Sequence, residues 1–119
     1  MLVTMGLFTL TEARAELDRL RPVLDEIVMV RADAAEAGAV VNAGGRGLPE
    51  WKAATARLDE LMTEIQQTGA VLKSLAPLLV DFPSDLDGVP VDLCWLEGET
   101  GITWYHRGDL GFAARRRLP

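Results

Sequence analysis

The 119-residue sequence contains one cysteine, Cys94, and one histidine, His106. A single cysteine excludes an intrachain disulfide framework, and so few thiols and imidazoles exclude a zinc site built from four Cys or His ligands of one chain. Basic residues are also scarce, with 12 Lys and Arg against 18 Asp and Glu and a net charge of −6. Because binding to nucleic acid and to anionic membranes depends on clustered positive charge, we expect neither kind of partner.

Long apolar runs are missing too. No stretch approaches the roughly 20 consecutive apolar residues of a membrane span. The first residues, Met1–Gly6, lack the basic region and the apolar core of a secretory signal. Together with the lone cysteine, these absences predict a cytoplasmic protein. A hydrophobic fraction of 49% and a charged fraction of 25% are ordinary for a globular protein, and the length suits a single domain, 1–119.

The first part of the chain has the residue pattern of a long helix. Thr9 and Glu12 stand at the spacing of a capping box, which marks a helix start. Apolar residues then recur every three or four positions to about Gly38, as on one face of a helix. Pro22 lies inside this segment and removes one backbone N–H, so we expect it to kink the helix.

A glycine-rich segment, 42–47, separates this helix from a second one. Pro49 suits the first turn of that helix, and Gly69 suits a left-handed residue at its end. The connector joins helix to helix and lacks the Lys-Ser/Thr pair of a phosphate-binding loop, so we interpret it as a plain connection. The simplest arrangement is an antiparallel helical hairpin over residues 9–68.

Beyond Gly69 the period of the apolar residues changes to two, which predicts strands. Asp87-Gly88 is a strong signal for a hairpin turn within this part. The predicted fold is therefore α+β: a long antiparallel two-helix hairpin, then a small antiparallel β-meander of three to four strands with a C-terminal tail, within 69–119. The segments with strand character are 71–75, 78–82, 89–96 and 102–106.

The connection between the last two strands leaves two registers open. A five-residue loop pairs Cys94 with Trp104 and Asp92 with His106, whereas a four-residue loop pairs Leu93 with His106. The two registers give the imidazole opposite sets of neighbours, and the sequence does not choose between them.

Carboxylates crowd the strands that precede the histidine. Between positions 81 and 99 lie six Asp and Glu residues and no Lys or Arg. One imidazole with two or three carboxylates is a donor set for a divalent ion such as Zn, Fe or Mn, and Asp81, Glu99 and His106 are the candidate metal ligands. The competing interpretation, which we favour, is structural, with His106 hydrogen-bonded to Glu99 or Asp92.

No complete catalytic signature is present, so the catalytic residues are unknown and enzymatic activity stays an open question. Cys94 with His106 could form a thiolate nucleophile, but Cys94 lies mid-strand among apolar residues, where inert burial is favoured. Ser74 or Ser84 with His106 lacks the sharp strand-to-helix turn that exposes a nucleophilic serine.

Six short motifs run through the sequence: Phe8-Thr9-Leu10, Val80-Asp-Phe-Pro83, Leu93-Cys-Trp95, Gly98-Glu99, Trp104-x-His106 and Gly111-Phe112-x-x-Arg115. In combination they resemble the small bacterial family catalogued as domain of unknown function 2203, over nearly the full chain. The resemblance implies a two-helix plus small-sheet protein and marks Asp81, Glu99, His106 and Arg115 as family positions. It implies no activity, because the family has none assigned.

Arg115 and Trp104 are the candidate ligand-binding residues. The guanidinium of Arg115 suits either of two roles. A bidentate bond to Asp81 or Glu99 would be structural, whereas binding of an anionic ligand would be functional. We favour the structural role.

Two functions from different classes are consistent with these features. The first is a non-enzymatic module whose helical hairpin self-associates or docks onto a partner, because a long two-helix arm leaves apolar surface uncovered. Val23, Val30 and Val40–Val41 lie off the main apolar stripe and predict a homodimer through the helices. The second is a metal- or small-ligand-binding protein, with or without catalysis, that uses the carboxylate–histidine cluster on the sheet.

Overall fold

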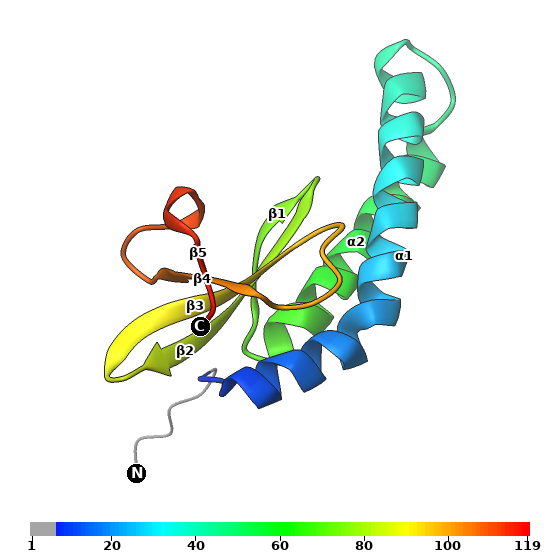
Figure 1. The fold of residues 1–119 in the computed structure, drawn as a ribbon. Coiled ribbons are helices and arrows are strands. Elements are labelled where there is room, and N and C mark those ends of the chain that lie inside the picture. The colour runs from blue at the N-terminus through cyan, green and yellow to red at the C-terminus, as the bar shows by residue number, and fades with distance from the viewer. Residues whose placement is uncertain (1–6) are drawn as a thin grey trace. The chain divides into compact units, whose positions relative to one another are not determined.

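The computed structural model describes residues 7–119, with two helices followed by a sheet (Figure 1). The predicted α+β class is therefore confirmed, although the sheet has five strands rather than three to four. The prediction that Met1–Gly6 carries no secretory signal concerns residues that lie outside the described part of the chain. The elements are α1 (Leu10–Asn42), α2 (Leu48–Gln67), β1 (Val71–Leu75), β2 (Leu78–Leu86), β3 (Val89–Leu96), β4 (Trp104–Arg107), a 3₁₀ helix (Phe112–Ala114) and β5 (Arg116–Arg117).

The chain divides into two compact units. One contains the chain up to Leu20 together with Ile65–Pro119, and the other contains Arg21–Glu64. The first unit holds the start of α1, the end of α2 and the whole sheet, whereas the second holds the remainder of both helices and their connection. The prediction of one domain over 1–119 stays a prediction. Within residues 7–119, no helix combines the length and the apolar character that crossing a bilayer requires.

The start of α1 has the predicted capping box. The backbone N–H of Thr9 donates to Oε1 of Glu12 over 2.9 Å, and the N–H of Glu12 donates to Oγ1 of Thr9 over 3.1 Å. Two N–H groups at the helix start are thereby satisfied by side chains. Pro22 lies inside the helix, which continues to Asn42, beyond the end predicted near Gly38.

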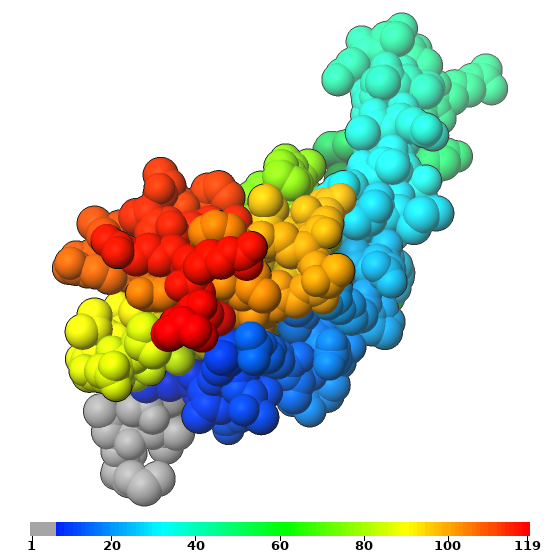
Figure 2. Space-filling view, in the orientation of Figure 1, coloured from blue at the N-terminus to red at the C-terminus, as the bar shows by residue number. Residues whose placement is uncertain are grey.

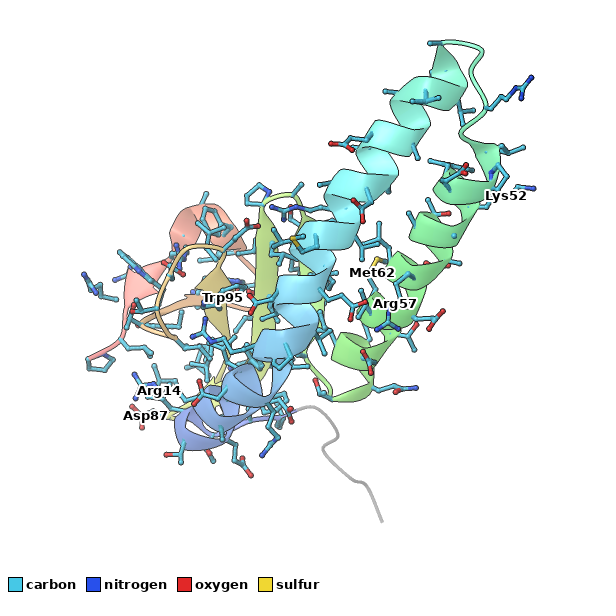
Figure 3. The ribbon with its side chains drawn as sticks, turned by 90° about the vertical axis from the view of Figure 1, so that its right-hand side faces the viewer. Arg14, Lys52, Arg57, Met62, Asp87 and Trp95 are labelled. Carbon is cyan, nitrogen blue, oxygen red and sulfur yellow. The ribbon has the colours of Figure 1, made fainter. Side chains whose placement is uncertain are left out.

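Gly38 serves packing rather than helix termination. A Cβ atom built there would lie 3.3 Å from Cδ1 of Trp51 in α2, so the absence of a side chain lets the indole approach α1. Further along the same unit, Arg57 of α2 binds both carboxylate oxygens of Glu26 in α1, over 2.6 and 2.8 Å (Figure 3). These contacts join the two antiparallel helices within Arg21–Glu64.

α2 ends where the sequence predicts. Its last residue is Gln67, and Gly69 has a φ of +94°, the left-handed conformation that an L side chain adopts only with strain. Thr68 completes the end of the helix, because its hydroxyl donates to the carbonyl of Ile65 over 2.6 Å. The chain then enters β1 within the sheet-containing unit.

The five strands are antiparallel and lie side by side in sequence order, β1-β2-β3-β4-β5 (Figure 1). Asp87 and Gly88, with φ of +53° and +85°, make the predicted tight turn between β2 and β3. β5 was not predicted from the sequence, because a pair of arginines carries no apolar alternation. Its pairing with β4, Tyr105 to Arg116 and Trp104 to Arg117, is what makes it a strand.

One face of the sheet carries the apolar core of its unit. The rings of Phe8 and Phe82 meet edge to face with centroids 5.4 Å apart. From the start of α1, Arg14 donates from Nε and Nη2 to the carbonyl of Ile102, over 3.3 and 3.0 Å, and so holds the connection that precedes β4 (Figure 3). The buried side chains that alternate on this face of β2 and β3 are Val80, Phe82, Val91, Leu93 and Trp95.

Candidate functional site

The opposite face of the sheet has polar side chains at its centre. The register pairs Asp81 of β2 with Cys94 of β3, and it pairs Cys94 and Asp92 of β3 with Trp104 and His106 of β4. Because paired residues of antiparallel strands project from the same face, these five side chains share one surface. The register predicted with the five-residue loop is therefore present, although the paired part of β4 begins only at Trp104, and the register of the four-residue alternative is wrong.

Three of these side chains form a buried cluster. Asp81, Cys94 and His106 have relative exposures of 2%, 0% and 2%. A carboxylate oxygen, the Sγ atom and an imidazole nitrogen from these residues all lie within 4.8 Å of one another. A carboxylate is rarely buried this completely unless a partner compensates its charge, so the partners of Asp81 decide the character of the site.

The two ring nitrogens of His106 have different partners. Nδ1 lies 2.9 Å from the carbonyl oxygen of Arg107, and Nε2 lies 3.1 Å from Oδ2 of Asp81. A carbonyl oxygen only accepts, so we assign the hydrogen of the ring to Nδ1. In the neutral imidazole, Nε2 then presents its lone pair to the lone pairs of Oδ2. Such a contact is repulsive unless a cation, either a proton or a metal ion, lies between the two atoms.

The second carboxylate oxygen of Asp81 also lacks a hydrogen-bond donor among the described residues. Oδ1 of Asp81 is buried and has no hydrogen-bond partner within the described part of the chain. An unpaired buried acceptor typically costs about 1–3 kcal/mol. Nearby, Oδ2 of Asp92 lies 3.9 Å from Nδ1 of His106, and burial together with the negative charge of Asp81 raises the pKa of Asp92. The cluster therefore has an excess of acceptors and lone pairs over donors.

Cys94 is protonated in this environment at neutral pH. Burial is the main cause, and the negative charge of Asp81 adds to it, so that the pKa of the thiol rises from an ordinary 9.0 to about 12. A thiol of this kind is a poor nucleophile, in agreement with inert burial. A divalent cation bound at the cluster would displace the thiol proton, because the metal then neutralises the sulfur in its place.

Glu99, the third candidate metal ligand, has a different set of partners. Nη2 of Arg115 donates to both of its carboxylate oxygens over 2.8 Å, and Oε1 also accepts from the N–H of Leu96 over 2.7 Å. The carbonyl of Glu99 accepts from Nε1 of Trp95 over 2.9 Å. The predicted bond between Arg115 and Glu99 is thus present, and it holds the turn after β3 against the C-terminal segment.

Aromatic rings complete the environment of Arg115. Its Cζ atom lies 4.9 Å from the ring centroid of Trp104 and 4.8 Å from that of Phe112, within the range of cation–π contacts. Arg117 approaches the Trp104 ring as well, at 5.1 Å. Figure 2 shows the C-terminal segment, in red, at the surface beside the orange residues that lead into β4. Because Trp104 pairs with Cys94 across β3 and β4, its contact with Arg115 brings the Arg115–Glu99 pair near the cluster. The positive charge of Arg115 lowers the pKa of the Cys94 thiol, against the larger effect of burial.

The family described as "Uncharacterized conserved protein (DUF2203)" matches residues 6–118. The chain belongs to this family. Membership in DUF2203 confirms the resemblance that the sequence motifs indicated, and the family description names no activity. No curated protein and no solved structure matches the chain.

In this DUF2203 chain, the structure brings together two of the three candidate ligands, Asp81 and His106, and sets Glu99 apart with Arg115. His106 takes Asp81 as its hydrogen-bonding neighbour, rather than the Glu99 or Asp92 that the structural interpretation favoured. The other candidate ligand-binding residue, Trp104, stacks on Arg115.

Cys94 is the member of the cluster that the predicted set of metal ligands did not include, although the sequence analysis paired it with His106 as a possible nucleophile. A signal for it existed in the Asp87-Gly88 turn. A two-residue hairpin turn places Leu86 opposite Val89, and counting back along both strands places Asp81 opposite Cys94. The proximity of the carboxylate and the thiol therefore follows from a turn that the sequence marks clearly.

Proposed function

We propose that this protein binds a divalent transition-metal ion through Asp81, Cys94 and His106, and that Zn²⁺ suits the site best. What carries the proposal is the 3.1 Å contact between Nε2 of His106 and Oδ2 of Asp81, because a neutral imidazole with its hydrogen on Nδ1 would face the carboxylate with a lone pair. A metal ion bound by both atoms, and by Oδ1 or Sγ beside them, would remove the repulsion and the unpaired acceptor together. A proton shared by the two atoms is the competing explanation.

The donor set favours zinc among the divalent metals. Imidazole nitrogen, thiolate sulfur and carboxylate oxygen are all zinc ligands, and a thiolate disfavours the hard ions Mg²⁺, Ca²⁺ and Mn²⁺. The carboxylate and the thiolate together neutralise a 2+ charge, which a buried site requires. Metal–ligand distances of about 2.0–2.3 Å place tetrahedral ligand atoms roughly 3.3–3.7 Å apart. The 3.1 Å contact between Nε2 and Oδ2 would therefore widen slightly, and separations near the upper bound of 4.8 Å would shorten.

Metal content of the purified protein tests the proposal. The protein is stripped with a chelator, incubated with one equivalent of Zn²⁺, desalted and analysed by plasma mass spectrometry. We expect about one Zn²⁺ per chain in the wild type and a loss of most of it in Asp81→Asn, Cys94→Ala and His106→Gln. Co²⁺ in place of Zn²⁺ should give a near-ultraviolet sulfur-to-metal charge-transfer band that disappears in Cys94→Ala, which reports the thiolate itself.

Asp92→Asn is the matched control, because Asp92 lies on the adjacent strand with its carboxylate 3.9 Å from the far nitrogen of His106. We expect this variant to retain the metal, and circular dichroism establishes that each variant is folded. A wild-type protein that retains no Zn²⁺ after desalting would refute the proposal and leave the shared proton. Equal loss of metal in Asp81→Asn and Asp92→Asn would also contradict it, because only one of these carboxylates belongs to the donor set.

A second candidate function is association through the helices, with a second copy of the chain as the partner. What supports it is the lack of burial in the distal part of the Arg21–Glu64 unit, where Gly47 is the single buried residue from position 28 to position 57. Large apolar side chains there are exposed, with relative exposures of 67% for Met29, 48% for Val40 and 46% for Leu48. Two such hairpins would cover these side chains as a four-helix arrangement does.

Light scattering at tens of micromolar protein tests this association. We expect the mass of a dimer for the wild type and a shift toward the monomer for Met29→Glu. Lys52→Glu on α2 also introduces a negative charge, and changes the net charge by more than Met29→Glu does, but at an exposed polar position, so it should leave the dimer intact (Figure 3). A monomeric wild type would contradict the proposal, as would equal effects of the two substitutions.

The state of Cys94 bears on the cellular compartment. Its thiol forms no disulfide, which supports the proposal of a reducing compartment such as the cytoplasm.

A further inference from the structure

The core face of the sheet continues into a hollow near the turn between β2 and β3. The hollow has a volume of about 390 Å³, within the range of small-molecule sites. Its apolar walls come from the ends of β2 and β3 and from the segment after β4, and Val91 is buried at its base with 4% exposure. The apolar lining residues are Leu86, Val89, Val91, Leu110 and Ala114.

Two polar side chains that border this hollow have no partner among the described residues. Across residues 7–119, neither the hydroxyl of Tyr105 nor the guanidinium of Arg116 takes part in a side-chain hydrogen bond or ion pair. Arg107 also borders the hollow, but Asp109 binds it through two contacts of 3.1 and 2.8 Å. The register of β4 and β5 places Tyr105 and Arg116 opposite each other on one face, so that both donors act on the same space.

The charge of this region is opposite to that of the whole chain. Residues 107–117 contain four arginines and one acidic residue, Asp109, in a protein whose net charge is −6. Arg107 is paired with Asp109 and Arg115 with Glu99, and Arg117 lies on the other face of the sheet. Arg116 therefore supplies the uncompensated positive charge at the hollow. Asp87 borders the hollow from the β2–β3 turn. An anionic group is therefore favoured near β5 and disfavoured near that turn.

We propose that this hollow binds a small amphipathic carboxylate, with its apolar body against Val91 and Leu110 and its carboxylate at Arg116 and Tyr105. The apolar walls gain from removal of their surface from water. The carboxylate accepts charge-assisted hydrogen bonds from the guanidinium and a further one from the phenol. The site is separate from the metal cluster, since Tyr105 and Arg116 lie on the opposite face of the sheet from His106.

Titration calorimetry with three probes tests this assignment. Octanoate carries both the apolar body and the carboxylate, 1-octanol carries the body alone, and acetate carries the carboxylate alone. We expect octanoate to bind about tenfold more tightly than 1-octanol, from the loss of one charge-assisted contact, and acetate not to bind measurably.

Arg116→Gln should remove the preference for octanoate over 1-octanol, and Tyr105→Phe should reduce it. Arg117→Gln is the matched control, because Arg117 lies on the other face against Trp104, and it should bind octanoate as the wild type does. The proposal is wrong if octanoate does not bind at millimolar concentration, or if 1-octanol binds equally well. Unchanged octanoate binding in Arg116→Gln would overturn it too, as would equal weakening in Arg117→Gln. None of these outcomes depends on the metal content of the protein.

Discussion

Replacement of Arg115 by alanine should destabilise the sheet-containing unit more than any other substitution of a charged residue in the C-terminal segment. Nη2 of Arg115 donates to both oxygens of Glu99 over 2.8 Å, and the two side chains have relative exposures of only 12% and 22%. The change leaves the carboxylate of Glu99 with the N–H of Leu96 as its remaining hydrogen-bond donor among the described residues.

The magnitude follows from the contacts that are lost. A hydrogen bond to a charged group contributes about 1.5–3 kcal/mol, and removal of one partner of a buried ion pair costs about 3–5 kcal/mol. Contacts of the guanidinium with Trp104 and Phe112 add about 0.5–1 kcal/mol each. Because Glu99 is partly exposed and keeps one backbone donor, the expected loss lies near the lower end, at about 3 kcal/mol.

Urea unfolding, followed by circular dichroism and by tryptophan fluorescence, measures this loss. Arg116→Ala is the control for stability, because its side chain has no partner within residues 7–119, and it should change the free energy of unfolding by no more than about 0.5 kcal/mol. Arg115→Lys keeps the charge but not the planar stacking, so it should fall between the two. If Arg115→Ala and Arg116→Ala are equally stable, the pair with Glu99 does not hold the C-terminal segment in place.

Three further predictions concern the helix start, a turn and the buried thiol. Thr9→Ala removes the capping hydroxyl and should lower the free energy of unfolding by about 1 kcal/mol in urea titrations, so an unchanged value would show that the capping bonds contribute nothing. Gly88→Ala should cost about 1–2 kcal/mol from its φ of +85° alone, since no atom lies within 4 Å of the added methyl group, and a neutral result would contradict a purely conformational effect. In the metal-free protein, the Cys94 thiol, with its pKa raised to about 12, should resist iodoacetamide at pH 8 and react only on unfolding. The raised pKa of this thiol stabilises the folded state, and the contribution is fully present below the ordinary pKa of 9.0. It should disappear between pH 9 and about 12, because the thiol ionises first in the unfolded chain. Denaturant titrations in which Cys94→Ala loses as much stability as the wild type over that range would contradict this prediction.

The local features of the fold could be predicted from the sequence because each depends on residues close together in the chain. The capping box of Thr9 and Glu12 needs only their three-residue spacing, and the end of α2 at Gly69 needs only a residue that tolerates a positive φ. The turn at Asp87 and Gly88 is of the same kind. These signals, with the change of apolar period, were sufficient for the order of the two helices and the first four strands and for the α+β class.

The composition of the buried cluster depended on tertiary structure. Asp81, Cys94 and His106 come from three strands, and they meet only because two registers hold at once. A shift of one residue between β3 and β4 would turn His106 to the other face, and the sequence was compatible with both loop lengths. The partner of Glu99 likewise depended on tertiary structure. Arg115, from the C-terminal segment, binds the carboxylate of Glu99 and so competes with any metal ion for it.

β5 is the simplest example of an element that local sequence does not determine and tertiary structure does. Arg116 and Arg117 have no apolar pattern, and a two-residue segment has no strand propensity of its own. It is a strand because β4 offers an unpaired edge, and the stacking and ion pair of Arg115 hold the chain beside that edge. The sequence alone therefore determined the two helices and the first four strands, since these depend on local period and turn chemistry. Tertiary structure decided which side chains share a face and which partner each charge takes, because those contacts join residues that only the packed sheet brings together.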